Sequence, residues 1–71
     1  STDGRFTLAF ESMPSQDATI SITDISGIVI FETKPNITLN YPLDLSHLNK
    51  GFYIIQVTNG QYRTKDKLII Q

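Results

Sequence analysis

Residues 43–57 read Leu-Asp-Leu-Ser-His-Leu-Asn-Lys-Gly-Phe-Tyr-Ile-Ile-Gln-Val, and this stretch decides the fold. Leu43 and Leu45 alternate with polar residues, which is typical of a strand with one face in the core. A short polar corner follows and ends at Gly51. Residues 52–57 contain a single polar side chain, so we expect a central strand that is covered on both faces.

The rest of the chain consists of short alternating runs that are separated by turn residues. Runs of this kind predict β-strands. Two pairs of neighbouring runs are separated by residues that favour tight turns: Asp24 with Gly27, and Asn59 with Gly60. The predicted strands cover residues 4–11, 18–23, 28–32, 37–45 (with a kink or bulge at Tyr41-Pro42), 52–57 and 62–70.

This pattern predicts the fold class. No ten-residue stretch has a helical period, so we expect no helix beyond a turn near residues 45–48. Six or seven short strands joined by turns predict an all-β protein, an antiparallel immunoglobulin-like β-sandwich. The 71 residues are enough for one domain only, which we expect to be excised from a larger protein because the sequence opens without an initiator Met.

Composition excludes several classes of function. The chain has no cysteine, so it has neither a thiolate nucleophile nor a thiolate metal site. A net charge of −1 gives no field that would attract nucleic acid. No apolar run approaches the roughly 20 residues that a membrane-spanning helix needs.

Residues capable of catalysis are few. His47 is the only histidine, and it follows Ser46 directly in the sequence. Adjacency in sequence does not make a catalytic pair, because a base must reach its nucleophile in space and needs a third group to orient it. The acids are scattered over different elements and have no spacing typical of a calcium loop. We therefore expect no enzyme activity, no metal and no cofactor.

The last predicted strand carries three basic residues on one face, namely Arg63, Lys65 and Lys67. They have two interpretations. They can contact an anionic partner, or they can form the solvated face of an edge strand and discourage aggregation. Without further information the second interpretation is favoured.

The order of three motifs resembles a known family. Asp-Ile-Ser-Gly covers residues 24–27, Ser-His-Leu-Asn-Lys-Gly-Phe-Tyr-Ile-Ile-Gln-Val covers residues 46–57, and Lys-Leu-Ile-Ile covers residues 67–70. This arrangement resembles the type A C-terminal sorting domain of the type IX secretion system, found in exported proteins of Bacteroidetes. Two features depart from the family pattern: the usual Asn-Pro start is missing, and Ile28 stands where Lys or Arg is common.

The resemblance implies a non-catalytic secretion signal. Such a domain directs a cargo protein through the periplasm and across the outer membrane to the cell surface or beyond. The implied partners are the outer-membrane translocon, which recognises the domain, and a sortase-like peptidase, which then removes it. We expect recognition by protein–protein contact, including pairing of strand edges. The expected recognition residues are Gly51, Phe52, Tyr53, Lys65, Lys67, Leu68, Ile69 and Ile70.

The sequence leaves three further interpretations open. Ile28 and Ile30 make their strand apolar on both faces, so we expect them to form an exposed contact patch. Apolar strand edges also allow self-association. The alternative to a sorting signal is a fibronectin-like or immunoglobulin-like accessory module that binds carbohydrate or spaces a catalytic domain. A sorting signal must lie at the extreme C-terminus of its parent protein, whereas an accessory module can lie anywhere.

Overall fold

A computed structural model gives the fold and describes residues 2–36 and 38–71. Over these residues it contains six strands and no helix, so no helix of membrane-spanning length is present there. The predicted all-β class is confirmed. The strands are β1 (Arg5–Ala9), β2 (Thr19–Asp24), β3 (Val29–Thr33), β4 (Asn40–Asp44), β5 (Gly51–Asn59) and β6 (Tyr62–Ile70).

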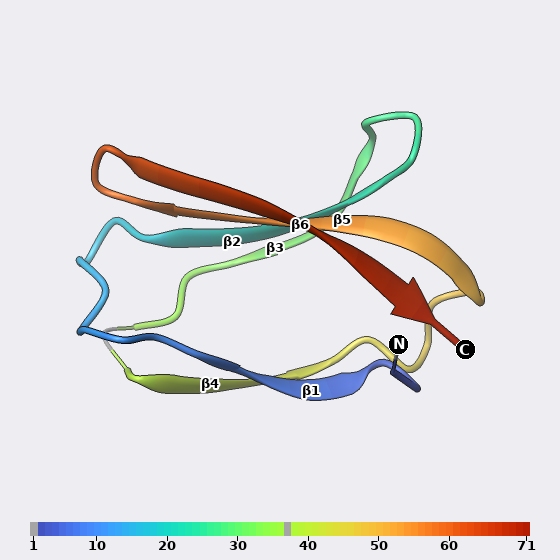
Figure 1. Ribbon diagram of the computed structural model, residues 1–71, viewed down its shortest axis with the longest axis horizontal. Coiled ribbons are helices and arrows are strands. Elements are labelled where there is room, and N and C mark those ends of the chain that lie inside the picture. The colour runs from blue at the N-terminus through green and yellow to red at the C-terminus, as the bar shows by residue number, and fades with distance from the viewer. Residues whose placement is uncertain (1, 37) are drawn as a thin grey trace.

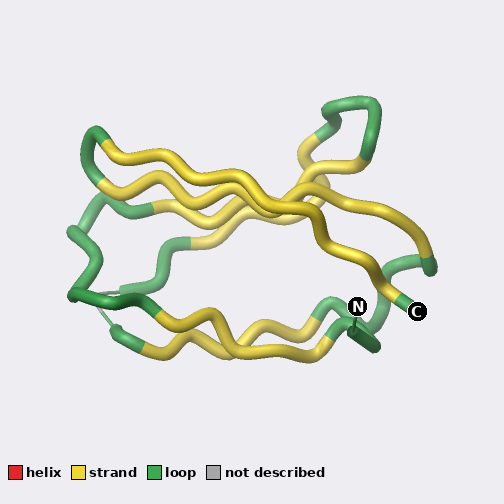
Figure 2. The backbone as a smooth tube through the Cα atoms, in the orientation of Figure 1, coloured by secondary structure: helices red, strands yellow, loops and turns green. Residues whose placement is uncertain are grey.

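The strands form two antiparallel sheets that pack as a sandwich (Figure 1). The larger sheet has the order β3-β2-β5-β6, and the smaller sheet pairs β1 with β4. The trace in Figure 2 shows that turns and loops connect the two layers at both ends. Two contacts at the sides also join the sheets: the Tyr41 hydroxyl lies 3.0 Å from the Thr33 hydroxyl, and the Thr2 N–H donates to the Ile69 carbonyl at 2.9 Å.

The core lies between the sheets and is built from alternate residues of each strand. Side chains of a strand point to opposite faces in turn, so a period-two sequence places one apolar set inside. Ile20, Ile22 and Leu45 have no exposed surface, and Ile70 at the end of β6 is 3% exposed. The predicted hairpin of β2 and β3 is present, but Ile30 forms a bulge in β3, because Phe31 pairs with Ile22 whereas Val29 pairs with Thr23.

The prediction for β5 is half right. This strand is central, with β2 on one side and β6 on the other. It is not covered on both faces, because no residue of β5 is fully buried and Phe52 is 53% exposed. The smaller sheet covers only the inner face, and the outer face meets solvent.

Strand boundaries differ from the sequence expectation at several ends. β1 is shorter than residues 4–11, and Phe10 continues it only through an N–H bond to the Leu39 carbonyl at 2.8 Å. β4 begins at Asn40; the predicted start at residue 37 lies outside the described residues. Pro42 causes no break in pairing, since it lies opposite Thr7 in a sheet of two strands, where one side of each strand needs no ladder bond.

Candidate recognition surface

Pairing of β5 with β6 brings together the two parts of the expected recognition region. The corner at the start of β5 and the end of β6 are far apart in sequence but adjacent in the sheet. The opposed residues are Gly51 with Ile70, Phe52 with Ile69, and Tyr53 with Leu68. The predicted recognition residues therefore form one continuous region, which the alternation of the strands divides between two faces.

The inward half of this region contributes to the core. Ile70 belongs to the buried cluster, and Leu68 and Tyr53 pack against it. The Tyr53 hydroxyl donates a hydrogen bond of 2.6 Å to the carbonyl of Asn49, which fixes the corner before β5. These side chains hold the fold together and offer little surface to a partner.

The outward half is accessible. Phe52 is more than half exposed, Lys65 is exposed, and Ile69 is half-buried beside them. The Lys67 ammonium lies 5.0 Å from the centre of the Phe52 ring, within the range of a cation–π contact. This contact holds Lys67 over the outer face of the sheet, so an exposed aromatic ring and a cation lie side by side there.

The basic row of β6 has no acidic residue opposite it on β5. Arg63 pairs with Thr58, Lys65 with Gln56 and Lys67 with Ile54. Within residues 2–36 and 38–71 the structure contains one ion pair, between Arg5 and Asp44 at 3.6 Å, on the other sheet. The three cations of β6 are therefore exposed and electrostatically uncompensated by the strand beside them.

Asp24 organises the turn between β2 and β3. Its carboxylate accepts hydrogen bonds from the Ser26 hydroxyl at 2.7 Å, the Ser26 N–H at 2.9 Å and the Ile28 N–H at 3.0 Å. The Ser26 hydroxyl bond and the backbone donors favour the charged form and lower the pKa of Asp24 from its ordinary value. The turn also places the Gly27 N–H 3.1 Å from the Asp24 carbonyl.

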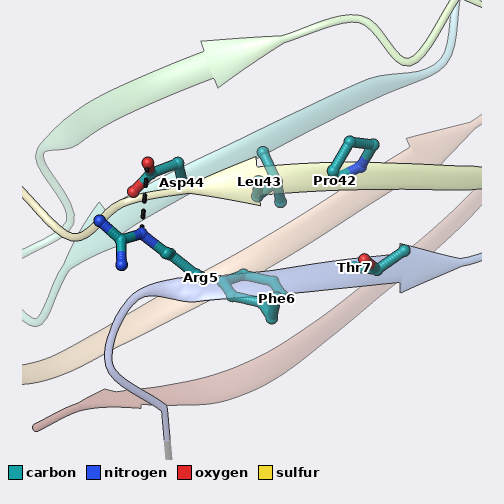
Figure 3. Close-up of a pocket in the computed structure, with 6 residues that line it drawn as sticks. All are labelled: Arg5, Phe6, Thr7, Pro42, Leu43 and Asp44. Carbon is teal, nitrogen blue, oxygen red and sulfur yellow. Dashed lines mark ion pairs between the residues drawn. The ribbon is translucent and has the colours of Figure 1, made fainter.

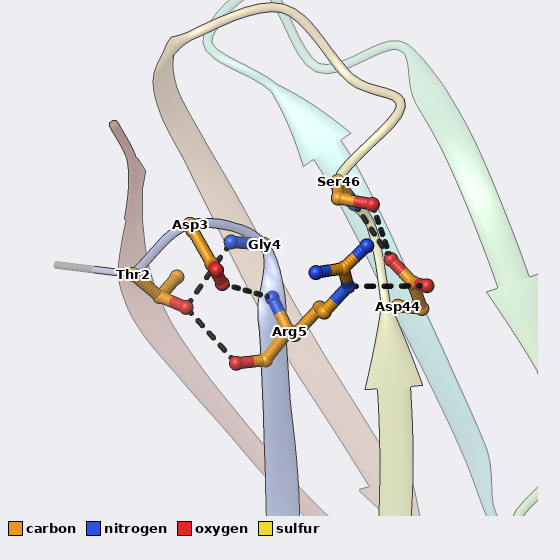
Figure 4. A network of polar contacts seen from close by, with 6 residues as sticks. All are labelled: Thr2, Asp3, Gly4, Arg5, Asp44 and Ser46. Carbon is orange, nitrogen blue, oxygen red and sulfur yellow. Dashed lines mark hydrogen bonds and ion pairs between the residues drawn. The ribbon is translucent and has the colours of Figure 1, made fainter.

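A second turn with the same pattern follows β4. The Asp44 carboxylate accepts from the Ser46 hydroxyl at 2.6 Å and from the Ser46 N–H at 3.0 Å (Figure 4). These bonds, with a smaller contribution from the Arg5 guanidinium, lower the pKa of Asp44. Figure 4 also shows Asp3 accepting from the Arg5 N–H, which starts β1 beside this turn.

A shallow depression of about 570 Å³ lies on the smaller sheet (Figure 3). Its polar groups are the paired Arg5 and Asp44 and the hydroxyl of Thr7, and Pro42 lies at its other end. The side chains hold each other and present no nucleophile with an oriented base.

A separate apolar surface lies at the tip of the β2–β3 hairpin, which projects beyond the rest of the larger sheet in Figure 1. Ile28 is 62% exposed and Ile30 is 38% exposed, so the structure places both side chains at the surface. Ile25 and Val29 are exposed beside them. Their role as a contact patch stays a prediction.

The remaining candidate residues do not converge. His47 is exposed in the turn before β5. Among the residues that the structure describes, no three His, Asp or Glu side chains are grouped so that they could hold a metal ion. The two most exposed large aromatic residues, Phe52 and Tyr62, fall on opposite faces of the larger sheet by register, so they cannot form the aromatic row that a carbohydrate would stack on.

Comparison with known protein families identifies the chain. Residues 2–71 match the model of the secretion system C-terminal sorting domain. The chain belongs to this family. It is a sorting signal of type IX secretion, and a protein that carries it is secreted through that system to the cell surface or the exterior. A search of curated protein sequences gives no significant match.

Sequence reasoning missed one feature of the sorting domain, a groove of about 480 Å³ between β1 and the β5–β6 hairpin. Leu8, Phe10, Val57 and Tyr62 are among the residues that line it. Alternation in the sequence does point these residues inward. What it cannot show is that two strands are too few to cover four, so part of the inner face of the larger sheet stays open.

Proposed function

We propose that this sorting domain is a non-catalytic signal that the outer-membrane translocon recognises through the outward residues of β5 and β6. A sortase-like peptidase then separates it from the cargo. The observation that carries the proposal is the register of Phe52 opposite Ile69, next to Lys67. It joins two sequence motifs of the family into one exposed surface.

The inner residues of the same region support recognition indirectly. Ile70 and Leu68 anchor β6 to the core, so the edge of the sheet keeps its shape. A recognition surface on a rigid strand loses less conformational entropy on binding than one on a loop. The exposed tip with Ile28 and Ile30 is proposed as a second contact, independent of the first.

The experiment fuses this domain to the C-terminus of a fluorescent reporter in a host with a type IX system. Deletion of residues 67–71 is expected to abolish export. Because Ile70 is part of the core, this deletion also tests folding, and circular dichroism of the isolated domain must accompany it.

Surface variants separate recognition from folding. Phe52→Ser and Lys67→Ser together should reduce export severalfold while the domain stays folded, because neither side chain is buried. Met13→Ser is the matched control, since Met13 is exposed and apolar but lies in the loop between β1 and β2, outside both proposed contacts. Export that is unchanged by the double substitution, or lost equally with Met13→Ser, would contradict the proposed surface. Mass spectrometry of the exported reporter shows whether the domain has been removed.

A further inference from the structure

The outer edge of β6 is open along most of its length. β6 is the last strand of the larger sheet, and a two-residue turn of Gly60 and Gln61 joins it to β5. In such a hairpin the flanking pair, Asn59 and Tyr62, exchanges both backbone hydrogen bonds, and the direction of the backbone groups then alternates. The N–H and C=O groups of Arg63, Lys65 and Lys67 therefore point away from β5.

Contacts at the end of the strand confirm this alternation. The Ile69 carbonyl accepts from the Thr2 N–H at 2.9 Å, and the Gln71 N–H donates to the Thr2 carbonyl at 2.8 Å. Thr2 covers this end of the edge and no more of it. The Lys67 N–H donates to the carboxylate of its neighbour Asp66 at 2.8 Å. In the described part of the chain no strand pairs with the outward backbone groups of Arg63 and Lys65.

The two sides of this edge differ in chemistry. On the outer side lie the three uncompensated cations Arg63, Lys65 and Lys67. On the inner side the groove between β1 and the β5–β6 hairpin is lined mainly by apolar and aromatic side chains, among them Leu8, Phe10 and Val57, and it also contains Glu11 and Thr64. An added strand would place its side chains alternately on these two sides, because successive residues of a strand point to opposite faces.

We propose that the edge of β6 accepts an extended segment of a partner protein in which acidic and apolar side chains alternate. Its acidic side chains pair with the row Arg63, Lys65 and Lys67, and its apolar side chains cover the groove. Backbone hydrogen bonds to Arg63 and Lys65 supply affinity, and the two rows supply specificity. This inference rests on the proposed recognition by the secretion machinery and specifies the chemistry of the segment that is recognised.

The same charges argue against a second copy of this chain as the occupant. An antiparallel pair of two β6 strands centred on Lys65 would place Lys65 opposite its own copy and Arg63 opposite Lys67. Like charges directly opposite each other destabilise strand pairing. Self-association through this edge, one of the expectations from the sequence, is therefore disfavoured.

The test uses the 71-residue chain and three labelled peptides of seven residues. One alternates Glu and Val, one alternates Lys and Val, and one has the composition of the first with its Glu and Val residues in two blocks. Fluorescence anisotropy is expected to show binding of the alternating acidic peptide at least about tenfold tighter than the other two, since several cross-strand charge pairs act together. Affinity should fall with added salt because the pairs are exposed.

Charge-reversing variants test the outer row. Lys65→Glu with Lys67→Glu should weaken binding of the acidic peptide about tenfold or more and favour the Lys-Val peptide instead. Lys34→Glu with Lys50→Glu is the matched control, because both lysines are exposed and lie outside β6. Equal loss in both double variants would mean that net charge alone attracts the peptide, which overturns the proposal.

A proline variant tests the backbone pairing. Lys65→Pro removes an N–H that points away from β5, so the sandwich should stay folded, as circular dichroism can verify. Peptide binding should be lost. In the parent chain, amide exchange of Arg63 and Lys65 should slow when the acidic peptide is added. Binding that survives Lys65→Pro without such protection, or concentration-dependent dimers that Lys65→Pro abolishes, would overturn the proposal.

Secretion and peptide binding are independent readouts. If no peptide binds but Phe52→Ser with Lys67→Ser still reduces export while the domain stays folded, this inference fails and the proposed function stands. If export is indifferent to deletion of residues 67–71 and to the surface variants, the proposed function fails whatever the peptides do.

Discussion

Two turns of this domain share the sequence pattern of Asp, an aliphatic residue and Ser, yet they lie in opposite surroundings. The Asp24 turn and the Asp44 turn have the same carboxylate-to-serine bonds, at 2.7 and 2.6 Å to the hydroxyls. In the first turn the aliphatic residue, Ile25, is 80% exposed, whereas in the second, Leu45 has no exposed surface. The local pattern specifies the turn, and the packing of distant strands decides what the turn contributes to stability.

The first prediction concerns the aliphatic position, where the difference is largest. Leu45→Ala should lower the free energy of unfolding by about 2–5 kcal/mol, because it leaves a cavity in the core. Ile25→Ala should change it by less than about 0.5 kcal/mol, as for most exposed positions. Urea denaturation measures both. Similar losses in the two variants would show that the turns are equivalent after all.

The second prediction concerns the glycine beside each turn. Gly27 has a φ of +93°, and a Cβ there would meet no atom within 4 Å, so Gly27→Ala should cost about 1–2 kcal/mol of backbone strain. Gly4 has a φ of +103°, and a Cβ would lie 2.7 Å from the backbone nitrogen of Ser46. Gly4→Ala should therefore destabilise the fold by the same backbone strain and by roughly 1–3 kcal/mol more, because of the steric clash.

The same denaturation experiment checks the glycine pair. The Gly4 carbonyl accepts from the Leu45 N–H at 2.7 Å, so displacement of Gly4 also disturbs the residue that fills the core. Equal stabilities of Gly4→Ala and Gly27→Ala would show that β1 shifts freely away from the Asp44 turn.

The third prediction concerns the two carboxylates and pH. Hydrogen bonds to Ser26 and Ser46 lower the pKa values of Asp24 and Asp44 in the folded state. A lowered folded pKa contributes stability that is present above the unfolded pKa of about 3.9 and is lost as pH falls through the folded value. Thermal melts should therefore show a smaller loss of stability in acid for Asp24→Asn and for Asp44→Asn than for the parent chain.

Salt separates the two carboxylates. Asp44 also faces Arg5, whereas the contacts of Asp24 are all with the turn itself. At about 1 M salt, where the screening length is about 3 Å, the effect of Asp44→Asn should shrink more than that of Asp24→Asn. An equal response to salt would mean that the ion pair between Arg5 and Asp44 contributes nothing to the difference.

The fourth and smallest prediction concerns the serines. Ser26→Ala and Ser46→Ala should each cost about 0.5–1.5 kcal/mol, because each removes one hydrogen bond to a charged group at an exposed site. NMR titration should show the pKa of the adjacent Asp rising in each variant, because the serine hydroxyl bond is the largest cause of the lowered value. An unchanged Asp pKa would assign the shift to the backbone donors instead.

The strand content could be predicted from the sequence because alternation is a local property. Leu43 and Leu45 show it in the residues around them, and both are buried as expected. The bulge at Ile30 could not be predicted, since it depends on which residue of β3 pairs with Thr23 across the hairpin. The exposed outer face of β5 could not be predicted either, because it depends on how many strands and sheets pack against β5 and not on the residues of β5 alone.

The candidate surface could be predicted in part. The motif around Gly51 and the one that ends at Ile70 both indicated recognition, and pairing of β5 with β6 brings them together. The sequence could not separate the outward Phe52 and Lys67 from the inward Ile70, because that assignment needs the register and the position of the second sheet. The open edge of β6 beside Lys65 follows from the order of the strands in the sheet, and this order cannot be predicted from the residues of one strand.

The bulge in β3 limits how the larger sheet can grow. Ile30 is an extra residue on an outermost strand, and such irregularities twist the margin so that another strand cannot align along it. The opposite margin, β6, is regular from Tyr62 to Ile70. A sheet that can add a strand at one margin only forms a finite assembly with one added strand per domain. A sheet that can add strands at both margins forms open-ended fibres. The irregular β3 margin thereby works against open-ended growth of the larger sheet.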